Sequence, residues 1–153
     1  MRLILSALAL FWASAVLAKD NLPASVITIL DQGEANCAAF ENGAFSVDNG
    51  GLSHMDLNGD GVKDWVVDEF HFRCSSAASL YCGTGGCMAH FIIGDVITKK
   101  LTKGWQVMPF GPMTVLLTQI HGTECGGSNL RPCVEALVWD ENDRLFATVK
   151  PLP

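Results

Sequence analysis

From His54 to Val67 the chain reads HMDLNGDGVKDWVV. Apolar residues lead into a loop of Asp, Asn and Gly, and Trp-Val-Val leads out of it, so this segment predicts two strands joined by a polar turn. The chain keeps this character beyond Gly43, where short runs rich in β-branched and aromatic residues are separated by Gly, Asn and Asp. Most of the chain is therefore expected to form β-structure.

One helix is expected before these strands. Apolar residues recur at helical spacing between Val26 and Ala39, which predicts an amphipathic helix over residues 23–39. Pro23 is tolerated in a first helical turn, whereas Gly33 weakens the pattern and predicts a break.

The strands are expected to follow one another through short turns. Gly111-Pro112 and the run from Asp140 to Asp143 have the composition of turns. Consecutive strands joined in this way form antiparallel meanders, so we predict an α+β domain with the helix packed on one antiparallel meander sheet. The expected strands are residues 44–47, 65–72, 88–93, 104–108, 114–120, 133–139 and 145–149.

The loop between the first two apolar segments has the composition of a cation site. Asp56, Asn58, Asp60 and Asp64 supply side-chain oxygens, and the carbonyl of Val62 could supply another. Three carboxylates in nine residues repel one another, and a divalent cation removes that repulsion. Oxygen donors favour Ca²⁺ over zinc or copper, while Mg²⁺ requires a tighter octahedron. The alternative is a polar β-turn, because Asn-Gly and Asp-Gly form tight turns without metal.

This loop is not a complete EF-hand, because Val67 stands at the twelfth position, where a bidentate Glu belongs. The string over residues 54–67 instead resembles the calcium loops of FG-GAP and VCBS-type repeats, in which strands flank D-x-N-x-D-G-x-x-D. That resemblance implies a structural Ca²⁺ held by the five residues named above. Without the Glu, we expect a dissociation constant of about 10⁻⁴–10⁻³ M. The chain has one copy, so the propeller fold of those repeats is not expected.

Six cysteines follow an apparent secretory signal over residues 1–18, in which Arg2 precedes an apolar run and Val16-Leu17-Ala18 offers a cleavage site. The mature part, residues 19–153, has the length of a single domain. An even number of cysteines behind such a signal predicts three disulfides and a periplasmic or secreted protein. A zinc site is the alternative. Two preferred pairs, Cys82–Cys87 and Cys125–Cys133, each close a Gly-rich loop. The third pair, Cys37–Cys74, is assigned by elimination.

Charge and hydropathy exclude some partners. The formal net charge of −6 argues against nucleic acid, which needs a basic face. The N-terminal apolar run is shorter than the roughly 20 residues of a membrane span, so no stable membrane anchor is expected. The partner is then an unknown protein or small molecule, and the sequence does not define the oligomeric state.

A second polar cluster lies in the Gly-rich segment from His121 to Cys133. His121 and Glu124 are candidates for acid–base chemistry, and Arg131 for binding a carboxylate. The alternative is a stapled surface loop with incidental polar residues. Together with DLNGDGVKDWVVD, SLYCGTGGC and ALVWD, the string HGTECGG…RPC resembles a group of secreted alphaproteobacterial proteins. That resemblance implies export and disulfides, but no activity.

Three function classes remain from the sequence. The first is a small exported binding or structural module that carries calcium. The second is a hydrolase that uses His121 and Glu124. The third, by analogy with other small stapled periplasmic domains, is an inhibitor of an envelope enzyme such as lysozyme, whose basic surface an acidic protein attracts. The first class is preferred, so an enzyme is not expected.

Overall fold

A computed structural model describes residues 21–148 of the chain. The predicted signal over residues 1–18 and the end of the last predicted strand, Val149, lie outside the described residues. One helix and a set of antiparallel strands confirm the α+β class, although the strands are divided among sheets and do not form one meander. Within the described part, no helix is both long and apolar enough to cross a membrane.

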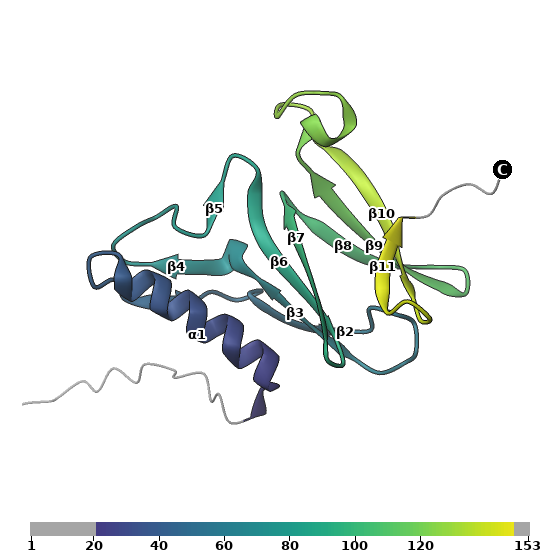
Figure 1. Cartoon of the computed structure of the whole chain (residues 1–153), viewed down its shortest axis with the longest axis horizontal. Coiled ribbons are helices and arrows are strands. Elements are labelled where there is room, and N and C mark those ends of the chain that lie inside the picture. Colours follow the sequence, from purple (N-terminus) through teal and green to yellow (C-terminus); the bar gives the residue numbers. More distant parts are fainter. Residues whose placement is uncertain (1–20, 149–153) are drawn as a thin grey trace, which may run out of the picture.

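The structure has three layers, with a central sheet between the helix and a second sheet (Figure 1). The central sheet has the order β2-β3-β6-β5, and β7 also pairs with β6. The outer sheet has the order β11-β10-β9-β8 and is the meander that the sequence predicted. A separate two-stranded sheet pairs β1 with β4. The elements are α1 (Ala24–Ala39), β1 (Phe45–Val47), β2 (Leu52–Met55), β3 (Asp64–Asp68), η2 (Glu69–His71), β4 (Phe72–Cys74), β5 (Cys82–Gly83), β6 (Gly86–Ile93), β7 (Val96–Thr102), β8 (Trp105–Phe110), β9 (Met113–Ile120), η3 (Gly122–Cys125), β10 (Cys133–Asp140) and β11 (Leu145–Thr148).

The central sheet is buried on both faces, which explains the imperfect alternation of its sequence. Successive side chains of a strand point to opposite faces. In β3, Val66 packs toward the outer sheet and Val67 toward α1, and both are fully buried. Phe91 and Ile92 of β6 divide in the same way. A strand covered on both sides needs apolar residues at nearly every position, so period-two patterning is lost.

The helix begins one residue later than predicted and continues through Gly33. A side chain at Gly33 would meet the rings of Phe72 and Phe45, because a Cβ added at this position would lie 3.0 Å and 3.1 Å from their nearest atoms. Glycine therefore brings the helix close to this aromatic pair and does not break it. The predicted weak point is instead a close packing position.

Two strand predictions need correction. The expected strand over residues 65–72 ends at Asp68, because the Asp68 side chain accepts a hydrogen bond from the Phe70 N–H at 2.9 Å and begins the short helix η2. The chain then continues as β4, in a different sheet. The second correction concerns two strands that the prediction omitted, the short β5 and the longer β7. The residues of β7 alternate between half-buried and exposed along most of its length.

All three predicted disulfides are present: Cys37–Cys74, Cys82–Cys87 and Cys125–Cys133. None of the six cysteines, all of which lie within residues 21–148, is free, so the structure does not support the zinc alternative. Cys37 and Cys74 are buried and join the end of α1 to β4. Three disulfides favour a protein that works outside the cytoplasm, where thiols are not kept reduced.

Candidate functional site

The predicted cation loop joins β2 to β3 and folds around the carboxylate of Asp56. Its Oδ1 accepts a hydrogen bond from the Gly59 N–H at 2.6 Å, and its Oδ2 accepts one from the Gly61 N–H at 2.9 Å. Both glycines have positive φ, 88° and 83°, which other residues adopt only with strain. The sharp turn predicted from the glycines is therefore present, and Asp56 holds it.

Asn58 and Asp60 continue this pattern on the exposed side of the loop. Asn58 Oδ1 accepts from the Asp60 N–H at 3.2 Å, and Asp60 Oδ1 accepts from the Val62 N–H at 2.7 Å. The Asn58 amide also donates to Asp60 Oδ2 at 2.9 Å. The hydrogen bond from Asn58 and then that from Val62 lower the pKa of Asp60, so this carboxylate stays ionised.

Asp64 differs from the other carboxylates because it is buried, at 7% exposure. Its Oδ2 accepts a hydrogen bond from the N–H of Leu57, a fully buried core residue, at 3.0 Å. Burial raises the pKa of Asp64, and the charges of Asp60 and Asp56 raise it further, against the opposing effects of the Leu57 hydrogen bond and His54. The negative charges of Asp56 and Asp60 therefore repel that of Asp64 at a position with little access to water.

The chemistry of this donor set fits a hard cation. Ca²⁺ would be held by the side chains of Asp56, Asn58, Asp60 and Asp64 and by the Val62 carbonyl, and it would neutralise their mutual repulsion. In residues 21–148, no three His, Cys, Asp or Glu side chains converge closely enough to form a metal site as they stand. Ca²⁺ would thus replace part of the hydrogen bonding that these side chains now make within the loop.

The Gly-rich segment from His121 to Cys133 brings His121 and Glu124 into one turn on the surface. His121 precedes η3, where its Nδ1 lies 2.7 Å from Thr123 Oγ1 and accepts from the Thr123 N–H at 3.3 Å. Glu124 and Arg131 are exposed. None of these three residues lines any of four pockets formed by the described residues. This geometry favours the stapled surface loop over the acid–base site.

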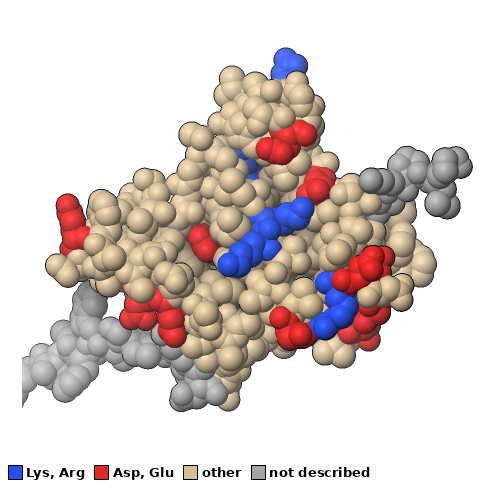
Figure 2. Space-filling model, viewed as in Figure 1, with Lys and Arg blue, Asp and Glu red and all other residues tan. Residues whose placement is uncertain are grey.

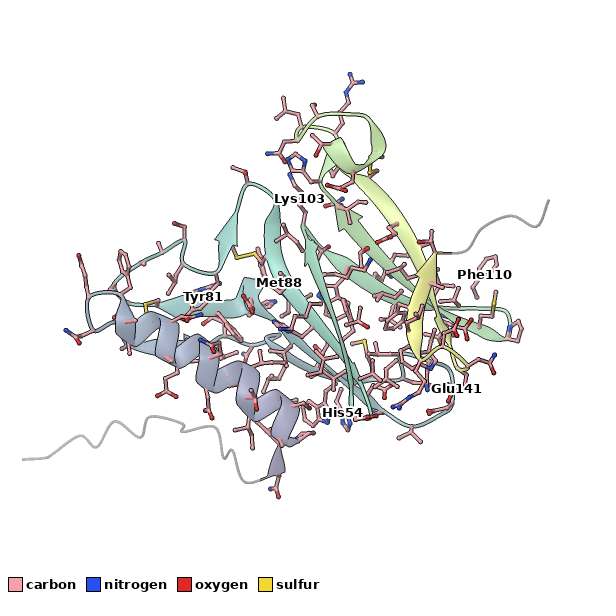
Figure 3. The ribbon with its side chains drawn as sticks, viewed as in Figure 1. His54, Tyr81, Met88, Lys103, Phe110 and Glu141 are labelled. Atoms are coloured by element: carbon pink, nitrogen blue, oxygen red, sulfur yellow. A yellow bond between two sulfur atoms is a disulfide. The ribbon has the colours of Figure 1, made fainter. Side chains whose placement is uncertain are left out.

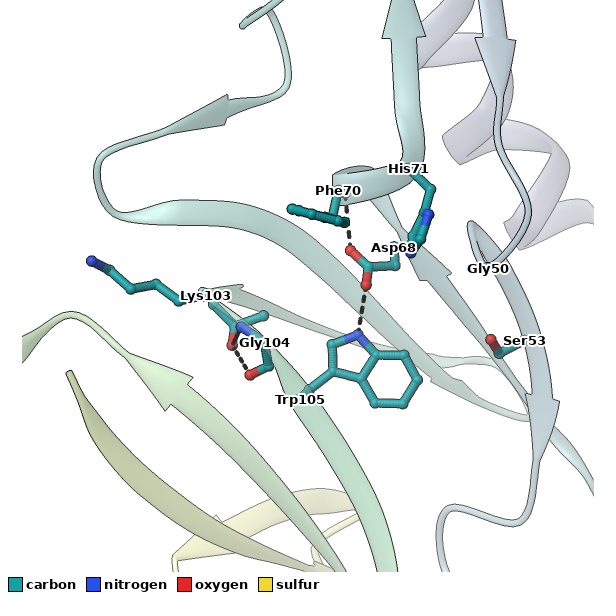
Figure 4. A pocket seen from close by; sticks show the side chains of 9 residues that line it. Gly50, Ser53, Asp68, Phe70, His71, Lys103, Gly104 and Trp105 are labelled. Atoms are coloured by element: carbon teal, nitrogen blue, oxygen red, sulfur yellow. Dashed lines mark hydrogen bonds between the residues drawn. The ribbon is translucent and has the colours of Figure 1, made fainter.

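A pocket that sequence reasoning missed opens where the two sheets meet (Figure 4). We call it the seam pocket; its volume is about 380 Å³, and Ser53, Asp68, Phe70, His71, Lys103 and Trp105 are among its lining residues. Asp68 Oδ2 accepts a hydrogen bond from the Trp105 indole N–H at 2.8 Å, which joins β3 to β8. No sequence signal links these two residues, because 37 positions separate them.

Asp68→Ala should destabilise the protein by roughly 1–3 kcal/mol, because the half-buried Trp105 N–H loses its acceptor and η2 loses its cap. Equilibrium urea unfolding, followed by tryptophan fluorescence, measures this loss. Ser53→Ala is the control in the same pocket, with an expected change within about 0.5 kcal/mol. Equal stability of the two variants would contradict a stabilising role for the Asp68–Trp105 bond.

Comparison of this chain with protein-family models, with curated proteins and with solved structures found no match. The case for its function therefore depends on the geometry of the loop and the pockets.

Proposed function

We propose that this protein is a small periplasmic or secreted binding module whose loop at residues 56–64 is stabilised by Ca²⁺. The observation that carries the calcium part is the buried carboxylate of Asp64, whose pKa is raised by burial and by two neighbouring acidic side chains. A buried charge among like charges is unfavourable unless a cation or donors compensate it. The single hydrogen bond from Leu57 compensates only part of it.

Calcium in this position has a structural consequence. The loop connects β2 and β3, and it also carries Leu57 into the core between the two sheets. An ion that orders the loop would therefore also fix the edge of the central sheet. This supports a stabilising role and not a sensor, since Asp64 and Leu57 are held in the packed interior and not on a surface that could open.

The binding part of the proposal is supported by pockets of suitable size. The seam pocket and a second pocket beside α1 have volumes of about 380 Å³ and 370 Å³. Pockets of roughly 300–1,000 Å³ are typical of small-molecule sites. Their position on a scaffold with three disulfides favours a preformed binding site over a hinge or lid.

Asp64→Asn should separate the effect of the buried charge on stability from the effect of Ca²⁺ binding. The variant removes the buried charge but keeps an oxygen that can accept from Leu57, so the calcium-free protein should be as stable as wild type or more stable. At the same time, the rise in Tm that millimolar Ca²⁺ gives to wild type should be lost or strongly reduced, because a charged ligand is missing. Thermal unfolding with EDTA and with Ca²⁺ measures both effects.

Asp143→Asn is the matched control, since Asp143 is an exposed carboxylate in the turn between β10 and β11. It should respond to Ca²⁺ as wild type does. Isothermal titration adds a direct test, and Mg²⁺ in place of Ca²⁺ tests the choice of ion. A wild-type protein with neither binding heat nor a Tm shift at millimolar Ca²⁺ would refute the calcium proposal.

A further inference from the structure

The second pocket lies between α1 and the central sheet, and we call it the helix–sheet pocket. Figure 3 shows Tyr81 and Met88, two of its lining residues, in the space between α1 and β6. Gln32 and Asn36 line it from the helix, one turn apart, and are hydrogen-bonded to each other at 2.9 Å. The pocket thus combines amide groups on one wall with an apolar thioether and a phenol on the other.

The polar group that distinguishes this pocket is His90 of β6, which is only 5% exposed. Its Nε2 lies 2.8 Å from Glu69 Oε1, so one ring nitrogen is paired with a carboxylate. The other, Nδ1, is buried and has no hydrogen-bond partner in the described part of the chain. Buried polar atoms are nearly always paired, so an unpaired nitrogen on a residue that lines a pocket indicates a missing partner.

Strand register places a cation beside this histidine. His90 pairs directly with Val67 on one side and with Lys99 on the other, so all three side chains project from the face that α1 covers. Lys99 also lines the pocket, is exposed, and forms no ion pair with any residue between 21 and 148. By contrast, Lys100 on the opposite face pairs with Glu135 at 2.9 Å.

The charge around the pocket differs from that of the whole chain. The formal net charge is −6, yet a band of basic side chains crosses the middle of one face, over β7 (Figure 2). β7 carries Lys99 and Lys100, and Lys103 follows it. Lys103 is held by Asn129, which leaves Lys99 as the cation of the three that has no partner among the residues described. Lys99 and Glu69 are the charged residues among those that line the pocket, and Glu69 is already paired with His90. The Lys99 ammonium is therefore the charge that can attract an anion.

We propose that the helix–sheet pocket binds a small carboxylate-bearing molecule, whose carboxylate is held by Lys99 and by His90 Nδ1. Glu69 supports this contact, because an imidazolium that donates its Nε2–H to Glu69 can donate its Nδ1–H to the ligand. Gln32 and Asn36 offer further hydrogen bonds to the rest of the molecule. This inference rests on the proposed binding role and names the class of ligand; it does not depend on calcium.

The test uses L-lactate, succinate and D-glucuronate as probes, with L-lactamide, succinamide and D-glucose as neutral counterparts. At millimolar concentration, at least one acid should shift the imidazole ¹⁵N signals of His90 in NMR spectra of the full mature protein, and its neutral counterpart should not. Lys99→Ala should weaken binding of that acid about tenfold, the loss expected for one charge-assisted contact. Lys63→Ala, which removes an exposed lysine from the loop between β2 and β3, should leave the affinity unchanged.

Glu69→Gln tests the role of His90 separately. Gln can still accept from Nε2 but carries no charge, so it stabilises the doubly protonated ring that the bound carboxylate requires less well, and carboxylate affinity should fall. Unshifted His90 signals with all three acids, equal binding of a neutral counterpart, or full affinity in Lys99→Ala would each overturn the proposal. The Ca²⁺-dependent Tm measured on the same sample reports the calcium part separately, so failure of one is distinguishable from failure of the other.

Discussion

Leu57→Ala should destabilise the protein by about 3–5 kcal/mol, a large share of the roughly 5–15 kcal/mol typical of a domain. Leu57 belongs to the polar loop by sequence, but its side chain is fully buried among Val66, Phe91 and Leu116. Truncation to Ala would leave a cavity between the two sheets that the flanking strands cannot close. Equilibrium urea unfolding of calcium-free protein measures the loss.

Val62→Ala is the control in the same loop, because the Val62 side chain is 65% exposed. Its stability should stay within about 0.5 kcal/mol of wild type. A Leu57→Ala loss no larger than that of Val62→Ala would contradict the position of Leu57 in the core. Leu57→Ala should also weaken Ca²⁺ binding. The Leu57 N–H donates to Asp64, and a loop that is poorly anchored in the core holds this carboxylate less firmly.

Replacement of both Cys37 and Cys74 by Ala should cost about 4 kcal/mol, the second large effect. A disulfide limits the freedom of the unfolded chain, and the limit grows with the number of residues that it encloses. This bond spans a sequence separation of 37 and ties the end of α1 to β4. Both cysteines are also buried, so their replacement disturbs packing.

The matched control is the double replacement of Cys82 and Cys87, which are separated by only five positions. The same entropy argument gives a loss of about 2 kcal/mol for this short loop. Thermal unfolding of both variants, purified under identical oxidising conditions, should therefore rank Cys37–Cys74 as the stronger contributor. The reverse order would show that the short bond stabilises the native state in another way.

Local sequence was sufficient wherever neighbouring residues decide the structure. The position of the helix, the turn at Gly111-Pro112, the hairpin from Asp140 to Asp143 and the two short disulfide loops all agree with expectation. Each depends on side chains and backbone within a few residues. The loop at residues 56–64 belongs here too, because Asp56 bonds to N–H groups only three and five positions away. The helix does not break at Gly33 as predicted, because that glycine packs against two aromatic rings that are distant in the sequence.

Local sequence was insufficient wherever an element meets partners on both sides. The run from residue 65 to 72 looked like one strand, because nothing in it shows that Val66 and Val67 enter different cores. Asp68 ends β3 by capping η2, but its second hydrogen bond, from Trp105 in the outer sheet, is visible only in the tertiary structure. The strands are divided among three sheets, and the central sheet is buried on both faces.

The sequence by itself determined the α+β class, the oxidised cysteines, the acidic balance and a loop whose oxygen donors suit a hard cation. Only the tertiary structure showed that the His121 cluster lies on the surface and that His90, Glu69 and Lys99 share a pocket. The physical reason is that short disulfide loops and Asx turns are closed by contacts between residues only a few positions apart in the sequence. A pocket is formed by side chains from α1, η2, β6 and β7, whose proximity depends on packing around the core and not on their order in the chain.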